Sequence, residues 1–187
     1  MRIQRNFALT ILAALWCVAP AEATTLARLN LDQLSAAADA VARVRCVTSE
    51  SRWENGDIWT LTTFAVVEVM KGNLPSQISV RVPGGHVGHL TASVEGTPKF
   101  NADDQAIVFL QHSSAGEFSV AGWVEGTFRI ALDAQSGHET VTQASSTFAV
   151  FDAATRTFRT EGIRRLPIEQ FHARVATAIE RAEEKSR

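Results

Sequence analysis

Alternating hydrophobic and polar positions dominate the middle of the chain. Ala42, Val44 and Cys46 alternate with two arginines and a valine, a pattern typical of a β-strand with one buried face. The pair Asn55-Gly56 follows, and it favours a tight type I′ hairpin turn because both central residues of that turn need a positive φ. The pattern therefore predicts a hairpin whose second strand covers about residues 58–70.

The predicted second strand is long, and both of its faces carry apolar residues. Strands of this kind usually bend and contribute to two sides of a closed or nearly closed barrel. With a period of two, Val67 shares a face with Leu61, Ala65 and Val69, and we expect that face to be buried.

Further short segments with strand-like patterns follow, separated by turns that contain glycine. They cover residues 78–82, 105–111, 117–124, 127–132 and 138–142. This spacing is typical of an antiparallel barrel or sandwich. We therefore expect a mostly β fold.

Helical patterns occur at the two ends of the predicted domain. Asn30 can cap a short helix, with Gln33 at the capping-box position. Pro167 suits a first helical position, and apolar residues then recur at steps of three and four: Ile168, Phe171, Val175, Ile179 and Ala182. We expect an amphipathic helix over 167–185 that packs on the barrel. Its polar face mixes both charges, unlike the basic face of a membrane-surface helix.

The first 23 residues have the three parts of a signal peptide. Arg2 and Arg5 precede a 12-residue uncharged run, and Ala21-Glu22-Ala23 follows a helix-breaking Pro20. Twelve helical residues span only about 18 Å, which is short of a bilayer core of about 30 Å. We therefore expect cleavage of 1–23 and a single domain, 24–187. The protein would be exported, periplasmic or secreted, with no stable membrane insertion after cleavage.

Charge and cysteine content narrow the functions further. Removing 1–23 leaves 16 basic and 19 acidic residues, without the clustered basic charge that nucleic-acid binding requires. Cys46 is then the only cysteine, so no disulfide can form within the predicted domain. Because Cys46 shares its strand face with Val44, we expect it to be a small core residue rather than a nucleophile.

Two segments carry a resemblance to a known family. Residues 37–50, and then Phe64-x-Val66-x-x-Val69 leading into Lys71-Gly72 and an alternating strand, resemble netrin-like modules. These are the OB-type barrels that include the tissue inhibitors of metalloproteinases. The chain also resembles uncharacterised bacterial secreted proteins, through Pro83, Gly84, Gly85, Phe100, Phe109 and Leu110. The resemblance implies an OB-like, netrin-like antiparallel barrel.

The chain departs from those inhibitors at the residue that carries their activity. They chelate the zinc of a protease through a cysteine at the mature N-terminus, whereas the predicted mature terminus here is Thr24. That inhibitory mechanism is therefore not expected. The resemblance still implies a role in binding another protein. Only fold analogy associates that role with proteases.

The chain lacks the sequence motifs of several enzyme classes. It contains no G-x-S-x-G elbow, no phosphate-binding G-x-x-x-x-G-K-[ST] and no G-x-G-x-x-G. The one candidate is the Gly-rich loop 83–89, where His86 and His89 could share a metal ion with Asp103, Asp104 or His112 as a third ligand. The alternative, an ordinary surface loop without metal, fits the same residues. We expect no cofactor.

Two tryptophans flank the predicted hairpin turn. Trp53 and Trp59 could form a contact surface for a protein or a carbohydrate, or they could pack across the strands of the hairpin. Taken together, these patterns favour an exported, non-enzymatic interaction module with a protein partner. The alternative is a secreted metal-dependent enzyme that uses the 84–89 loop.

Overall fold

A computed structural model describes residues 29–113, 116–147, 150–152, 157–159 and 162–185. The predicted signal peptide lies outside these residues. The main sheet contains the strands β1 (Ala40–Glu54), β2 (Asp57–Lys71), β3 (Gln77–Pro83), β6 (Gln105–His112), β7 (Phe118–Val120), β8 (Thr127–Leu132), β9 (Glu139–Gln143) and β12 (Leu166–Pro167). Two small hairpins pair β4 (Gly85–Val87) with β5 (Leu90–Ala92), and β10 (Val150–Asp152) with β11 (Thr157–Arg159). The helices are α2 (Leu31–Ala37), α3 (Ile168–Lys185) and the 3-10 turn η2 (Ala144–Thr147).

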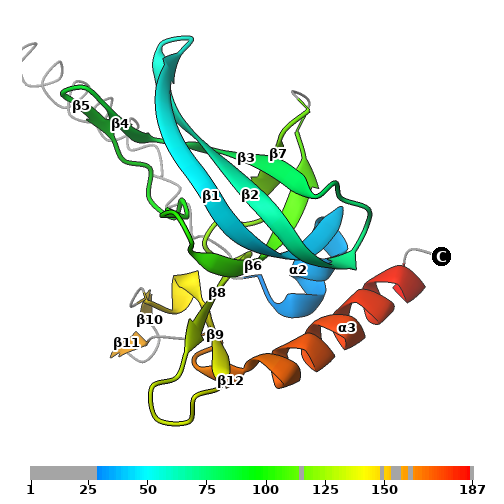
Figure 1. Ribbon diagram of the computed structural model, residues 1–187. Coiled ribbons are helices and arrows are strands. Elements are labelled where there is room, and N and C mark those ends of the chain that lie inside the picture. The colour runs from blue at the N-terminus through cyan, green and yellow to red at the C-terminus, as the bar shows by residue number, and fades with distance from the viewer. Residues whose placement is uncertain (1–28, 114–115, 148–149, 153–156, 160–161, 186–187) are drawn as a thin grey trace, which may run out of the picture.

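Five strands close into a ring. They follow the order β1-β2-β3-β7-β6, and β6 pairs again with β1 (Figure 1). This ring confirms the expected mostly β, barrel-like fold. One pairing differs from an all-antiparallel sheet, because β3 and β7 run parallel where Val80 meets Phe118.

The hairpin of β1 and β2 is the largest unit of the barrel, and it turns at Asn55-Gly56 as expected. Its register shifts at three places between Val41 and Thr48. Such irregularities bend a strand and increase its twist, and β1 can then pair with β2 along its length and with β6 at its beginning.

The buried face of β2 is the opposite of the expected one. Ile58, Thr62 and Phe64 point into the barrel, whereas the side chain of Val67 is 56% exposed and Val69 is 41% exposed. The expectation that Val67 is buried is therefore wrong. Both faces of β2 carry apolar residues, so the alternation alone did not distinguish the inner face from the outer one.

Two hydrophobic cores lie on opposite faces of β6. Ala106, Val108 and Leu110 belong to the core inside the barrel, and Ile107 and Phe109 belong to a second core beneath the helices. Strand β1 divides its residues between the same two cores. The first core also contains Cys46, which is fully buried as expected, together with Phe64, Ile78, Val80, Val82 and Phe100.

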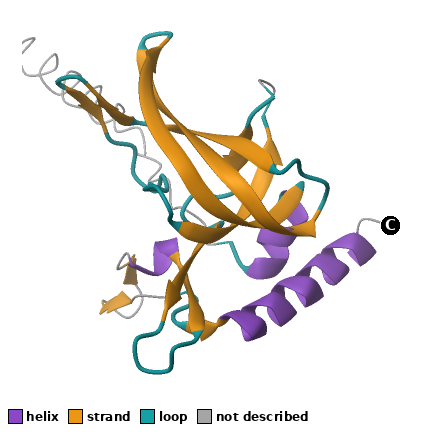
Figure 2. Cartoon of the chain, viewed as in Figure 1, coloured by secondary structure: helices purple, strands orange, loops and turns teal. Residues whose placement is uncertain are grey.

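Both expected helices are present, and they lie side by side at one end of the barrel (Figure 2). Asn30 and Gln33 form the predicted capping box, with two bonds of 2.9 Å. Helix α3 begins at Ile168 rather than Pro167, which pairs in β12. Its apolar stripe is buried in the second core, where Phe171 lies 4.7 Å from Phe128 between ring centroids.

The expected strand over 117–124 is much shorter in the structure. Only Phe118–Val120 is a strand, and the chain then turns through positive φ angles at Gly122 and Trp123. This turn brings Glu125 to the helical end of the barrel. In the described part of the chain, no helix has the length and apolar character that crossing a bilayer requires.

Candidate functional site

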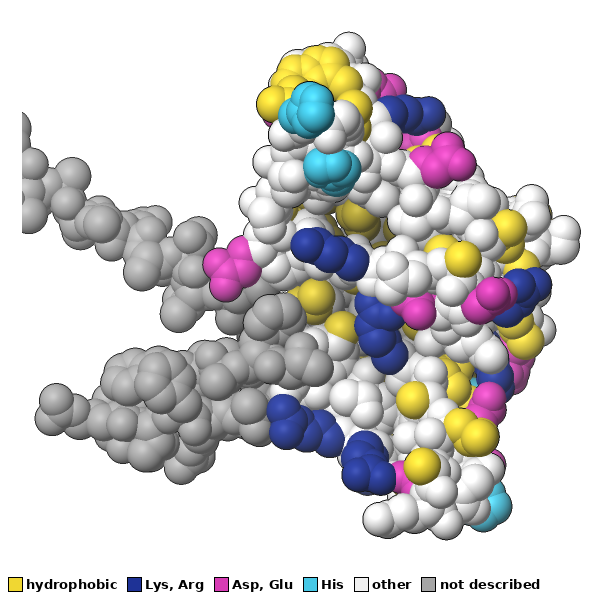
Figure 3. Space-filling model, turned by 60° about the vertical axis from the view of Figure 1, so that its left-hand side comes forward, with side chains coloured by type: hydrophobic (Ala, Val, Ile, Leu, Met, Phe, Trp, Pro, Cys, Tyr) yellow, Lys and Arg dark blue, Asp and Glu magenta, His cyan; other side chains and the backbone are white. Residues whose placement is uncertain are grey.

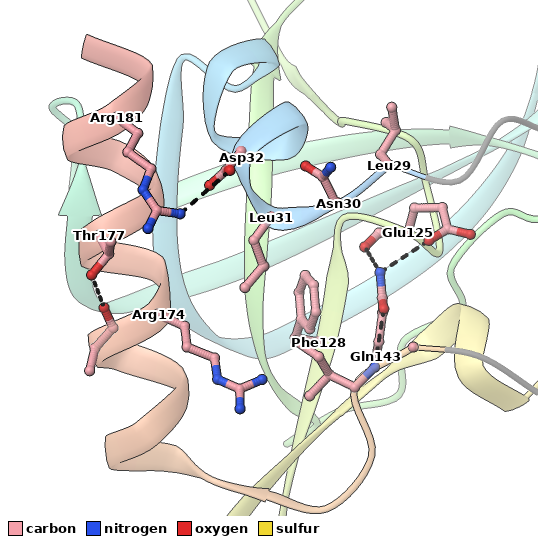
Figure 4. A pocket seen from close by; sticks show the side chains of 13 residues that line it. Leu29, Asn30, Leu31, Asp32, Glu125, Phe128, Gln143, Arg174, Thr177 and Arg181 are labelled. Atoms are coloured by element: carbon pink, nitrogen blue, oxygen red, sulfur yellow. Dashed lines mark hydrogen bonds and ion pairs between the residues drawn. The ribbon is translucent and has the colours of Figure 1, made fainter. Parts of the chain in front are cut away.

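A cleft of about 720 Å³ lies between the two helices and the end of the barrel (Figure 4). One wall is α3, which contributes Ala173, Arg174, Thr177 and Arg181 at helical spacing. The other wall comes from Leu29 and the start of α2, and the floor comes from Glu125, Phe128, Gln143, Gly162 and Ile163. The face of α3 that lines the cleft is adjacent to the stripe buried in the second core.

The floor contains a buried carboxylate held by neutral donors. Gln143 Nε2 donates to the Glu125 backbone oxygen at 2.8 Å and to its Oε2 at 3.0 Å. Ser145 Oγ donates to the same Oε2 at 3.0 Å. Glu125 is 7% exposed and has no cationic partner among the described residues. These hydrogen bonds offset part of the cost of burying the carboxylate, and they give the floor a defined shape.

At Gly162 the backbone passes close to the side chain of Gln143, which belongs to this hydrogen-bond network. The φ of Gly162 is +115°, and a Cβ at this position would lie 2.8 Å from Gln143 Oε1. A larger residue would therefore push against the buried amide. The next residue, Ile163, donates its backbone N–H to the same Oε1 at 3.4 Å and lines the cleft.

Two arginines on α3 differ in how they are held. Arg181 forms an ion pair with Asp32 of α2 at 3.6 Å and so connects the two helices across the cleft. Arg174 makes no hydrogen bond or ion pair with any described residue, and its guanidinium extends over the floor near Phe128 and Gln143 (Figure 4). A guanidinium without a described partner, in a cleft that also exposes the apolar side chains of Leu31 and Ile163, suits a ligand with an apolar body and a carboxylate.

The two predicted tryptophans do not form one surface. In the hairpin register Trp53 is opposite Ile58, and Trp59 is opposite Arg52. Cross-strand partners share a face, so the two indoles lie on opposite faces. Trp53 is 56% exposed, whereas the guanidinium carbon of Arg81 lies 4.3 Å from the centroid of the Trp59 ring, a cation–π arrangement.

His86 and His89 lie on the small β4–β5 hairpin. His86 Nδ1 is 2.9 Å from Thr91 Oγ1, and both imidazoles are exposed. Figure 3 views the side of the molecule where this hairpin lies and shows two histidine side chains near each other at its upper edge.

The three possible third ligands of a metal ion at this hairpin are engaged elsewhere. Asp103 bonds Arg45 at 3.0 Å, Asp104 bonds Arg129 at 2.9 Å, and His112 contacts Asp39 at 3.2 Å. Within the described ranges, no three His, Cys, Asp or Glu residues are grouped so that they could hold a metal ion.

Cys46 is held in its neutral form by its surroundings. Burial raises the pKa of its thiol, and the carboxylates of Asp104 and Asp103 raise it further. Its Sγ lies 3.7 Å from the Thr48 carbonyl oxygen. A neutral, inaccessible thiol is a poor nucleophile, which agrees with its place in the barrel core.

The residues that form the cleft were not identified from the sequence. In the sequence, Arg174 is one of the charged residues on the mixed polar face of the C-terminal helix, and Glu125 and Gln143 belong to no motif. The one available signal was a glutamate in the apolar segment 120–128. No known family model and no curated protein matches the chain.

Proposed function

We propose that the chain is an exported, non-enzymatic interaction module that binds an apolar segment of a partner protein in the cleft beside α3. The observation that carries this proposal is the guanidinium of Arg174, which has no partner among the described residues and lies in a cleft that also contains the apolar side chains of Leu31 and Ile163. A peptide segment would place apolar side chains against Leu29, Leu31 and Ile163, which line the cleft and are only partly buried. A carboxylate of the same segment would then pair with Arg174.

The resemblance to netrin-like modules is part of the same proposal. A five-stranded ring with helices at one end supports it. Fold analogy alone associates such a module with proteolysis. The partner is therefore defined here by its chemistry, an apolar segment with an acidic group.

Export is proposed from the first 23 residues. Mass spectrometry of the protein recovered outside the cytoplasm should find Thr24 at its N-terminus. An intact Met1 in the membrane fraction would contradict export by cleavage.

The cleft can be tested by photo-crosslinking in the cells that produce the protein. A photoreactive residue at position 177 would line the cleft, and the same residue at position 176 would be exposed on α3 outside it. We expect a discrete protein adduct from position 177 that is absent from position 176. Arg174→Glu should weaken that adduct at least several-fold, because the lost charge pair is replaced by a repulsive one.

Two outcomes would contradict the proposal. Equal adducts from positions 176 and 177 would show general surface contact rather than a cleft. An adduct at 177 that is unchanged by Arg174→Glu would show that the guanidinium has no part in binding. Arg164→Glu, on the loop before α3, provides a matched change of charge outside the cleft lining.

A further inference from the structure

The mouth of the barrel is lined by hydroxyl groups rather than by the apolar side chains found deeper inside. Ser49 pairs with Thr62 at 3.0 Å and Ser51 with Thr60 at 2.9 Å, between cross-strand neighbours of β1 and β2. The next inward residue of β2 is Phe64, in the barrel core. The inner face of the hairpin therefore changes from apolar to hydroxyl-lined toward its tip.

Counting the hydroxyl protons shows which of them face the mouth. Thr60 Oγ1 donates its only proton to the Gly84 carbonyl oxygen at 2.6 Å, so Ser51 must donate to Thr60. In the pair of Ser49 and Thr62, one hydroxyl proton forms the hydrogen bond between them. The other hydroxyl proton has no acceptor among the described residues. Thr62 is 1% exposed. When Thr62 donates to Ser49, the buried hydroxyl is satisfied and the Ser49 proton is left free at the mouth.

A hairpin covers this mouth and leaves a pocket beneath it. The pocket has a volume of about 240 Å³ and lies between the hydroxyls, β4–β5 and the segment 97–100. At about 30 Å³ each, it has room for roughly eight water molecules. Gly85 permits the close approach: its φ is +137°, and a Cβ there would lie 2.2 Å from Ser51 Oγ and 2.4 Å from Thr60 Oγ1.

The charged side chain in the lining of this pocket is Lys99, and the lining contains no aspartate or glutamate. The Lys99 ammonium forms no ion pair or hydrogen bond with the described residues, although Asp103 and Asp104 follow closely in the chain. Figure 3 shows a hollow on this side of the molecule, with hydrophobic atoms at its bottom and basic side chains along its lower edge. Val82 and Phe100 supply an apolar wall.

We propose that this pocket binds a small polyhydroxylated acid of monosaccharide size, such as a hexuronate. One of its hydroxyl groups would accept the free proton of Ser49, another would donate to Ser51 Oγ, and its carboxylate would pair with Lys99. The C–H face of its ring would lie against Val82 and Phe100. A neutral sugar leaves Lys99 without a partner, and a bare anion leaves the hydroxyls and the apolar wall unused. This site is separate from the cleft beside α3.

Titration of the protein with galacturonate, followed by the amide NMR signals of Ser49, Gly85 and Lys99, tests the site. Glucose serves as the neutral probe and inorganic phosphate as the bare anion. We expect galacturonate to shift these signals and to bind at least tenfold more tightly than either control probe. Lys99→Gln should weaken galacturonate binding about tenfold or more, since a hydrogen-bonded charge is lost.

Two matched variants separate the pocket from general effects. Lys185→Gln removes a lysine at the end of α3, and Ser76→Ala removes a serine hydroxyl from the loop before β3. Both should bind galacturonate as the unaltered protein does, whereas Ser49→Ala should weaken it several-fold.

Four results would contradict the proposal. If phosphate binds as tightly as galacturonate, the pocket is an adventitious anion site. If glucose binds as tightly as galacturonate, Lys99 has no role in recognition. No shift with galacturonate, or equal loss in Lys99→Gln and Lys185→Gln, would overturn the proposal. None of these results affects the crosslinking test of the cleft.

Discussion

The two hydrophobic cores share β1 and β6 but are enclosed in different ways. The barrel core is surrounded by a ring of five strands, and its polar opening is lined by paired hydroxyls. The second core is covered by α2 and α3, and its aromatic rings come from Phe109, Phe128 and Phe171, which are far apart in the chain. Backbone hydrogen bonds enclose the first core. The helices cover the second core mainly through side-chain packing, and Lys71 Nζ also donates hydrogen bonds to the carbonyl oxygens of Ser35 and Ala38 at the end of α2. The second core therefore depends more on individual side chains.

Truncation of Phe171 tests that dependence with the largest expected effect. Phe171 is fully buried and lies 4.7 Å from Phe128 between ring centroids. Phe171→Ala should lower the free energy of unfolding by about 3–5 kcal/mol, the usual loss for a core aromatic residue. Chemical denaturation followed by circular dichroism measures it.

Two further variants test how far the stability of the two cores is linked. Phe64→Ala makes the same truncation in the barrel core and should cost a similar amount if the two cores unfold together. Arg174→Ala, exposed on α3, should change stability by less than about 0.5 kcal/mol. A loss below about 1 kcal/mol in Phe171→Ala would show that α3 is not docked through this stripe.

The second core shows how much of the fold could be predicted. The stripe of α3 was visible because its apolar residues recur every three or four positions, and the capping box of α2 is a local signal. The sequence did not show that β6 would be buried on both of its faces. A short run of consecutive apolar residues does not show which neighbours will cover each face. The inner face of β2 was predicted incorrectly for a related reason, since both of its faces are partly apolar.

The candidate sites could be predicted even less from the sequence. The cleft combines Glu125, Gln143 and Arg174, which meet only because the chain turns at Gly122 and Trp123 and α3 returns to the barrel. The barrel-mouth pocket depends on the cross-strand register of β1 and β2, and on the hairpin that Gly85 allows to approach. Register and long-range docking leave no fixed spacing in the sequence. His86, by contrast, was singled out for metal binding and lines the mouth pocket.

The buried network beside the second core gives the next largest expected effect. Glu125→Ala removes the oxygen that accepts hydrogen bonds from Gln143 Nε2 and Ser145 Oγ. Leaving a buried donor without a partner costs about 1–3 kcal/mol. We expect a loss in that range by chemical denaturation. Glu125→Gln keeps an acceptor at the same place and should lose less than half as much, whereas equal losses would show that packing rather than hydrogen bonding matters at this position.

The smallest expected effect concerns the outer face of the barrel, on β2. Val67 is 56% exposed, so Val67→Asp places its carboxylate in water and should cost at most about 1 kcal/mol, the range of strand propensities. Val66 is partly buried against the barrel core, so Val66→Asp should cost clearly more, because its carboxylate would be desolvated without a partner. Thermal unfolding of both variants measures the difference. If Val67→Asp melts below Val66→Asp, the inward face of β2 is the one that carries Val67.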